Sequence, residues 1–169
     1  MKKIVVIKIV IVLSLAAVLI FGGREMAALR NFKEPLVMGP AVVSVRKLSD
    51  YVPKLKNTWG DTDIFELDSG VPGATALLLG GTHPNELSGV IAAFTMVENA
   101  VMESGRLLIM PHFNRSGSTA TQPMGGYPQF MHVPAPWGEQ VFRMGDRLVN
   151  PLDQWPDPEV YIHYPTGQM

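Results

Sequence analysis

The chain has 169 residues, of which 47% are apolar and 17% charged, so it can bury the core of one ordinary domain and does not have the composition of a disordered protein. It has no cysteine, which excludes a disulfide scaffold, a cysteine zinc cluster and a thiol nucleophile. Its formal net charge is −1, so no basic excess indicates nucleic acid, and we expect no nucleic-acid partner.

An apolar segment lies near the start of the chain. Residues 4–21 are apolar except for Lys8 and Ser14, and two lysines precede them. The whole segment is long enough to span a hydrocarbon core of about 30 Å, whereas the run after Lys8 has the length of a signal-peptide core. Residues 1–23 are therefore predicted to be a signal anchor or a cleaved signal peptide, and a buried core helix is the remaining interpretation. We expect membrane contact through residues 4–21, with the protein anchored facing the exterior or periplasm, or exported after cleavage.

The next segment, residues 24–59, is predicted to be a juxtamembrane connector with one short strand at Pro40–Val45. The charge balance changes at its end. Residues 1–59 hold ten Lys/Arg and three Asp/Glu, whereas residues 60–169 hold four and twelve. We predict that this acidic part, residues 60–169, is the working domain.

The first half of the acidic part shows strand and helix patterns in regular succession. The predicted elements are a half-buried strand at Asp61–Asp68, a strand buried on both faces at Ala74–Leu79, a helix at Leu87–Met102 and a strand at Leu107–Met110. A strand, a helix and a strand joined by short connections form a β-α-β unit, in which the two strands are parallel. The predicted fold class is therefore α/β, with a mostly parallel sheet and flanking helices, preceded by an N-terminal apolar helix.

The last part of the chain, residues 115–169, loses this regularity. It is rich in glycine and proline, with aromatic residues scattered among them, and we predict no regular element in it. A loop of this length without structure is uncommon inside a compact domain. We therefore expect either an ordered functional loop or a segment whose packing partners lie outside this chain.

The most informative segment is Gly80-Gly-Thr-His-Pro-Asn-Glu-Leu-Ser-Gly89, which follows the predicted buried strand. His83 and Glu86 lie there at the carboxyl edge of the sheet, where open α/β sheets place their sites. An imidazole nitrogen and a carboxylate oxygen can bind one zinc ion at about 2.0–2.2 Å, and the two glycines allow a sharp turn beside it. The competing interpretation is that Glu86 caps the following helix and His83 is an ordinary turn residue.

The same segment resembles a known family. Gly81-Thr-His-Pro-Asn-Glu-Leu-Ser-Gly89 resembles the Gly-Thr-His-Gly-Asn-Glu signature of the succinylglutamate desuccinylase/aspartoacylase family, a branch of the zinc carboxypeptidase-like hydrolases, with Pro84 in place of the usual glycine. Arg106-Leu-Leu-Ile-Met-Pro-His-Phe-Asn114 is similar to that family as well. The resemblance covers residues 62–118 well and residues 119–169 loosely. It implies a partial zinc-carboxypeptidase-like fold and Zn²⁺ as the cofactor.

The resemblance also implies roles for individual residues, with His83 and Glu86 as two zinc ligands. Asn114 and Arg115 follow the last predicted strand, and we take both as candidate substrate-binding residues, because a guanidinium can bind an anionic substrate by paired hydrogen bonds. A solvated arginine is the competing interpretation. In the family, the third zinc ligand and a general-base glutamate lie further along the chain, and neither is identified here, so the catalytic residues stay unknown. We expect this chain to be the N-terminal part of a longer protein, and a degenerate gene is the second explanation.

The other histidines are weaker candidates for the third zinc ligand. His163 lies in Tyr-Ile-His-Tyr, which has the composition of a short strand, and His112 follows a strand end that could face the same edge. An ordinary exposed or packed histidine is the competing interpretation for both. We interpret His132 as a loop residue.

The sequence thus predicts a zinc-dependent hydrolase that is incomplete in this chain. The resemblance implies that it cleaves an amide bond of an N-acyl amino acid or a short peptide, so its partner would be a small-molecule or peptide substrate. A membrane-tethered binding module without chemistry is an alternative. A non-functional gene remnant is another, and it would leave apolar sheet edges exposed.

Overall fold

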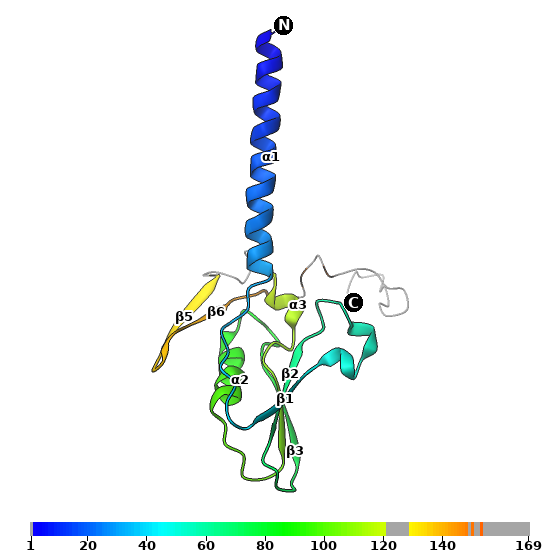
Figure 1. Ribbon diagram of the computed structural model, residues 1–169, viewed down its shortest axis with the longest axis vertical. Helices are drawn as coiled ribbons and strands as arrows, with labels where there is room; N and C mark the ends of the chain where they lie inside the picture. Colours follow the sequence, from blue (N-terminus) through cyan, green and yellow to red (C-terminus); the bar gives the residue numbers. More distant parts are fainter. Residues whose placement is uncertain (1, 121–128, 149, 151–152, 154–169) are drawn as a thin grey trace. The chain divides into compact units, whose positions relative to one another are not determined.

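The chain forms two compact units, Met1–Lys33 and Glu34–Met169, in the computed structural model (Figure 1). The residues that the structure describes are 2–120, 129–148, 150 and 153. The first unit contains helix α1, Lys2–Arg30. The apolar window of α1 has a mean hydropathy of 3.1, and none of it is buried. The helix is therefore long and apolar enough to be a signal anchor or a membrane span.

The second unit contains a four-stranded sheet, a two-stranded hairpin and two short α-helices (Figure 1). Its strands and α-helices are β1 Val42–Lys47, β2 Asp63–Asp68, β3 Thr75–Leu79, α2 Leu87–Asn99, β4 Arg106–Met110, α3 Arg115–Ser118, β5 Phe130–Ala135 and β6 Gly138–Arg143. Two 3-10 turns, Leu48–Asp50 and Pro53–Leu55, lie between β1 and β2. The strands and the helix predicted before residue 115 are all present, with small shifts of their ends.

The sheet is mixed, so the prediction of a mostly parallel sheet is wrong. Its strands lie in the order β1-β2-β4-β3, and β3 with β4 is its one parallel pair within the described residues. β1 pairs antiparallel with β2, and β2 pairs antiparallel with β4. The cause is the short link from β2 to β3, residues 69–74. Because a parallel return needs a crossover of about a dozen residues, β3 runs opposite to β2, and only α2 provides a crossover that makes β4 parallel to β3.

One face of the sheet packs against α2 and forms the core. Phe65 and Leu67 of β2 and Ile109 of β4 contact Ala93 and Val97 of α2, and all five side chains are buried. In Figure 1, α2 lies along one side of the strands. Apolar residues recur three and four positions apart along α2, which directs them to one side of the helix and towards the sheet.

β3 differs from the predicted strand buried on both faces. Leu77 is 55% exposed and Leu79 is 41% exposed, while Leu78 is half-buried. A continuous apolar run indicates that both faces of a strand are apolar, but burial needs a layer of structure on each face. β3 is the last strand in the sheet order, and Leu77 and Leu79 lie on the face away from α2, where no described residue buries them.

Part of the segment predicted to lack regular elements forms α3 and a β5–β6 hairpin, so that prediction is wrong for these residues. Phe142 of β6 packs against Leu87, Val90 and Phe94 of α2, and the hairpin thereby completes the second half of the core. Pro134 lies inside β5 and interrupts the pattern of alternating residues that marks a strand, which hid this element in the sequence.

β1 lies within the predicted connector, residues 24–59, and is a strand of the sheet. Ser44 Oγ donates a hydrogen bond of 2.8 Å to a carboxylate oxygen of Glu66 on β2. The guanidinium groups of Arg46 and Arg106 both lie 3.4 Å from the same carboxylate. The segment from residue 34 onwards therefore builds the same unit as β2 and β4, while the predicted functional boundaries stay predictions.

Candidate metal site

Two glycines shape the turn after β3. Gly81 has a φ of +64°, a conformation that other residues rarely adopt. A Cβ atom on Gly80 would lie 2.7 Å from the carbonyl oxygen of Gly89, and one on Gly81 would lie 2.9 Å from Cγ2 of Val90. Because neither position has room for a side chain, the two glycines determine the path of the chain that carries His83 past the carboxyl end of the strand.

His83 and Glu86 lie together in this turn, where α2 begins. His83 Nδ1 is 3.3 Å from Glu86 Oε1, and the two side chains are 37% and 63% exposed. The backbone N–H of Glu86 donates to the carbonyl of His83 at 2.8 Å. Glu86 occupies the N-cap position of α2, but its side chain makes no capping hydrogen bond. The structure therefore places the two predicted ligands side by side, with neither used to cap the helix.

The spacing of these two polar atoms fits a shared metal ion. Two donor atoms on one tetrahedral zinc ion, with bonds of about 2.0–2.2 Å, lie about 3.4 Å apart. The observed 3.3 Å is close to this value, and it also suits an ion pair without metal. A zinc site needs a third protein ligand, and no group of three His, Cys, Asp or Glu side chains that could hold a metal occurs among the described residues. The residues present fit two positions of a zinc site.

Asn85 lies between the two predicted ligands in the sequence and has an unused acceptor. Its side-chain oxygen Oδ1 is buried and has no hydrogen-bond partner within the described part of the chain. Buried polar atoms in proteins are nearly always paired, and an exception calls for a specific explanation such as a water or an ion. A water molecule or a ligand N–H group could satisfy this oxygen.

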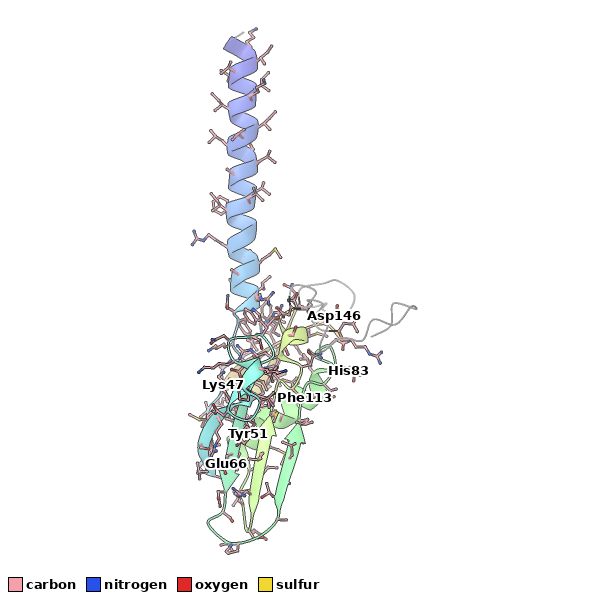
Figure 2. The ribbon with its side chains drawn as sticks, turned by 90° about the vertical axis from the view of Figure 1, so that its right-hand side faces the viewer. Lys47, Tyr51, Glu66, His83, Phe113 and Asp146 are labelled. Atoms are coloured by element: carbon pink, nitrogen blue, oxygen red, sulfur yellow. The ribbon has the colours of Figure 1, made fainter. Side chains whose placement is uncertain are left out.

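The end of β4 is tied to the same turn. The backbone N–H groups of Phe113 and Asn114 donate to the carbonyls of the two glycines at 2.8 and 3.3 Å. Figure 2 shows Phe113 and His83 towards the same end of the sheet. The Asn114 amide nitrogen donates to the carbonyl of Thr82 at 3.4 Å, and its Oδ1 accepts from the backbone N–H of Gly117 at 2.9 Å, which caps α3. Asn114 thus supports the turn of His83, and both its amide atoms have partners within the chain.

Arg115 is directed to the loop that precedes β2. Its guanidinium donates to the carbonyl oxygen of Asp61 at 3.0 Å and lies 5.8 Å from the ring centre of Trp59, a cation–π contact. A substrate carboxylate would have to compete with the Asp61 carbonyl for this donor. The substrate-binding roles of Arg115 and Asn114 stay predictions.

A second pair of a histidine and a carboxylate lies in the interior, and we call Glu34, His112 and Ser118 the inner cluster. His112 Nε2 is 3.1 Å from Glu34 Oε2, and His112 Nδ1 is 3.2 Å from Ser118 Oγ. The side chains of His112 and Glu34 are 20% and 9% exposed. The ring of His112 also meets Phe94 edge to face, with 5.7 Å between ring centres. Both ring nitrogens of His112 therefore have protein partners, and its role as a third ligand stays a prediction.

The inner cluster holds its carboxylate in the charged form. Burial acts to raise the pKa of Glu34, but the hydrogen bond with His112 and the charge of that ring act to lower it. The backbone N–H groups of Glu34 itself and of Arg143 also act to lower it, the second from 3.3 Å. The net result is a pKa below the ordinary value of 4.5.

The remaining histidines do not join the His83 turn in the described residues. His132 Nδ1 lies 3.0 Å from Glu139 Oε2 on the β5–β6 hairpin, and both side chains are more than half exposed. This pair shows that two such groups can meet on a surface without belonging to a strand-end turn. His163 lies outside the described residues.

Sequence reasoning missed Glu34. It is 78 positions away from His112 and lies in a segment predicted to be a connector, where a single charged residue has no distinguishing pattern. Its burial against β4 and β6 depends on tertiary contacts between distant segments, so no local signal was present that could have identified it.

Comparison with known proteins gives one solved structure. No family model matches the chain, and no curated protein matches it. The chain is similar to a structure described as the product-bound Ectoine utilization protein EutE (DoeB) from Ruegeria pomeroyi, with 28% sequence identity and a TM-score of 0.31. The match covers 46% of this chain and spans 26% of the other, which is too limited a superposition to assign a fold or an activity.

Proposed function

We propose that this chain is the zinc-binding part of a hydrolase of the succinylglutamate desuccinylase/aspartoacylase type, with His83 and Glu86 as two ligands of the metal. The observation that carries the proposal is the 3.3 Å approach of His83 Nδ1 to Glu86 Oε1 in a glycine-shaped turn at the carboxyl end of β3. Attachment to a membrane through α1, with the second unit on the exterior or periplasmic side, is part of the proposal.

Three further observations support a site in this turn. The segment Gly81–Gly89 resembles the family signature. Glu86 has no capping hydrogen bond, so a structural role at the helix end does not account for its side chain. Asn85, the residue before Glu86 in the sequence, has a buried acceptor that a bound water or ligand would satisfy.

Each residue of the turn has its own role in the proposed site. His83 offers a neutral nitrogen and Glu86 a negative oxygen, which are ligand types that zinc accepts. A zinc ion bound here would lower the pKa of its water and polarise the carbonyl of the scissile bond. Asn114 holds the turn in place through the Thr82 carbonyl. The proposed substrate is an N-acyl amino acid or a short peptide cleaved at an amide bond, with Arg115 as the anion-binding candidate.

The first test is a zinc titration of the full chain in detergent, measured by calorimetry. We expect weak binding, because two protein ligands leave the metal largely hydrated, and we expect the His83→Ala/Glu86→Ala variant to lose it. The matched control is His132→Ala/Glu139→Ala, which removes another exposed pair and should bind zinc as the parent does. Equal zinc binding by the parent and the His83→Ala/Glu86→Ala variant would refute the site.

Hydrolysis assays on N-acyl amino acids and short peptides test the second half of the proposal. The described residues supply no third ligand group and no identified general base, so we expect little or no turnover by this chain. Robust hydrolysis that His83→Ala abolishes would instead mean that this chain completes the site by itself.

A binding module without chemistry is the second candidate function. The exposed leucines of β3 favour it, because an apolar strand edge in solvent is a feature of association surfaces. Unchanged zinc binding in the His83→Ala/Glu86→Ala variant would favour this candidate over the hydrolase.

A further inference from the structure

The segment that follows β4 holds the turn of His83 in place. The backbone N–H of Phe113 donates to the carbonyl of Gly80 at 2.8 Å. The backbone N–H of Asn114 donates to the carbonyl of Gly81 at 3.3 Å. Because these bonds join the chain after β4 to the chain after β3, the position of the turn depends on the position of the segment after β4.

His112 begins this segment, and both its backbone and its ring are held. Its carbonyl accepts a hydrogen bond of 2.8 Å from Thr62 Oγ1, directly before β2. Its Nε2 lies 3.1 Å from a carboxylate oxygen of Glu34, and its Nδ1 lies 3.2 Å from Ser118 Oγ. A charged carboxylate only accepts hydrogen bonds, so Nε2 carries a hydrogen and donates it to Glu34. Three distant segments of the chain thus fix the position of His112.

The ring of His112 also contacts the helix that begins at the second proposed ligand. Phe94 of α2 meets the ring edge to face, with 5.7 Å between ring centres. Phe94 is buried in the same core cluster as Leu87, the first residue of α2, and Glu86 is the N-cap of that helix. His112 therefore contacts the helix of Glu86 and adjoins the segment that holds the turn of His83.

We infer that His112 is a positioning residue for the proposed zinc site and that Glu34 holds it in the required orientation. The inference rests on the proposed function, because it concerns the same two ligands. In this role His112 does not touch the metal. It keeps the strand-end turn and the start of α2 at the separation that brings His83 Nδ1 to 3.3 Å from Glu86 Oε1. The loss of hydrogen-bonding groups behind metal ligands typically costs about 10–100-fold in metal affinity.

Glu34 gives the connector a part in this site. It lies four residues after the end of α1 and is the first residue of the second unit. The chain that follows it is tied to α2, because the N–H of Val37 donates to a carboxylate oxygen of Glu98 at 3.3 Å and the N–H of Gly39 donates to the carbonyl of Val97 at 3.1 Å. The orientation of His112 therefore needs the connector from Glu34 onwards.

The test compares two amide substitutions of His112 in the full chain in detergent. The side chain of glutamine can place its amide nitrogen where Nε2 lies and keep the bond with Glu34. Asparagine is one methylene shorter, so its amide reaches only the position of Nδ1 and loses Glu34. We expect His112→Asn to weaken zinc binding by about tenfold in calorimetry, the lower end of the range for such groups, and His112→Gln to keep most of the affinity.

The glutamine variant also separates positioning from direct ligation. An amide is not among the side chains that zinc ordinarily binds. If His112 were itself a ligand, His112→Gln and His112→Asn would lose zinc affinity alike. Equal losses in the two variants would therefore overturn the inference.

Amide hydrogen exchange without metal separates positioning from a general loss of stability. In His112→Asn the amides of Phe113 and Asn114 should exchange faster relative to those of the central strand β4. The matched control is Leu67→Ala, which removes a fully buried side chain that pairs with Leu107 at the other end of β4. It should accelerate exchange without singling out Phe113 and Asn114, and it should leave the zinc affinity of the folded chain unchanged.

The outcomes separate the inference from the proposed function. Equal zinc affinity in His112→Asn and the parent, or exchange at Phe113 and Asn114 that rises no more than in the control, would overturn the role of His112 alone. A parent chain that binds zinc no more tightly than the His83→Ala/Glu86→Ala variant would refute the proposed function, and the inference would be overturned with it.

Discussion

Two pairs of a histidine and a carboxylate in the second unit have nearly the same spacing and opposite surroundings. His83 and Glu86 are 3.3 Å apart and partly exposed, in a turn at a strand end. His112 and Glu34 are 3.1 Å apart and largely buried, and the ring of His112 also meets Ser118. The exposed pair can exchange its contact for a metal ion at little cost. The buried pair is already satisfied by the protein and serves to hold segments together.

The two pairs differ in their environment much more than in their distance. A buried carboxylate loses its hydration and needs every partner it has, so removing one leaves an uncompensated charge. An exposed ion pair contributes about 0–1 kcal/mol to the free energy of unfolding, because water solvates one group when the other is removed. We therefore expect the inner cluster to affect the free energy of unfolding and the His83–Glu86 pair to affect ligand binding.

The largest expected effect is the loss of stability in Glu34→Ala. The substitution removes a buried carboxylate that pairs with His112 and accepts a hydrogen bond from the Arg143 backbone N–H. Breaking a buried pair in this way lowers the free energy of unfolding by about 3–5 kcal/mol. The matched change Glu86→Ala is exposed and should stay within about 0.5 kcal/mol of the parent. Urea denaturation of both variants provides the comparison. Similar free energies of unfolding for the two would remove the distinction between the pairs.

A smaller loss of stability is expected from a substitution that strains the turn of His83 but leaves His83 and Glu86 unchanged. Gly81→Ala places a side chain at a φ of +64° and 2.9 Å from Val90, so it should cost about 1–2 kcal/mol from the backbone alone and weaken zinc binding. Gly89→Ala adds a Cβ with ordinary contacts of 3.5 Å inside α2, where alanine is favoured by about 1 kcal/mol. Thermal denaturation and zinc titration of the two variants test this contrast. Full zinc affinity in Gly81→Ala would mean that the glycine turn does not position the ligands.

The smallest expected effect is a change in how steeply the stability of the protein falls at acid pH. The pKa of Glu34 is lower in the folded chain than its ordinary value of 4.5, so the charged form contributes stability above about pH 4.5 that is lost as the pH falls through the folded pKa. Melting temperatures between about pH 3 and pH 6 should therefore fall less steeply with decreasing pH in Glu34→Gln than in the parent. Identical slopes would show that the inner cluster does not hold Glu34 in its charged form.

The local patterns predicted most of the first half of the second unit. The alternation at Asp61–Asp68, the apolar run at Ala74–Leu79 and the helical period after Leu87 each depend on neighbouring residues, and each corresponds to an element of the structure. The sheet order and the antiparallel pairs were not predicted, because they depend on which distant strands meet. The exposure of β3 was missed for the same reason, since a sequence shows that a face is apolar but not whether another layer covers it.

The candidate site was predictable only where its residues are close in sequence. His83 and Glu86 lie three positions apart after two glycines, so one turn brings them together and the sequence shows the pair. Glu34 and His112 meet only through the tertiary fold, and Arg115 takes Asp61 and Trp59 as partners that no spacing suggests.

The most direct test of the central claim is a zinc titration of the full chain with ¹⁵N-labelled histidine, followed by long-range ¹H–¹⁵N spectra of the imidazole rings. Single-histidine variants assign the four rings. The account predicts that zinc shifts a ring nitrogen of His83, that this shift is lost in Glu86→Ala, and that the nitrogens of His112 do not change. Zinc-dependent shifts at His112 with His83 unchanged, or no shift at His83 at any zinc concentration, would contradict it.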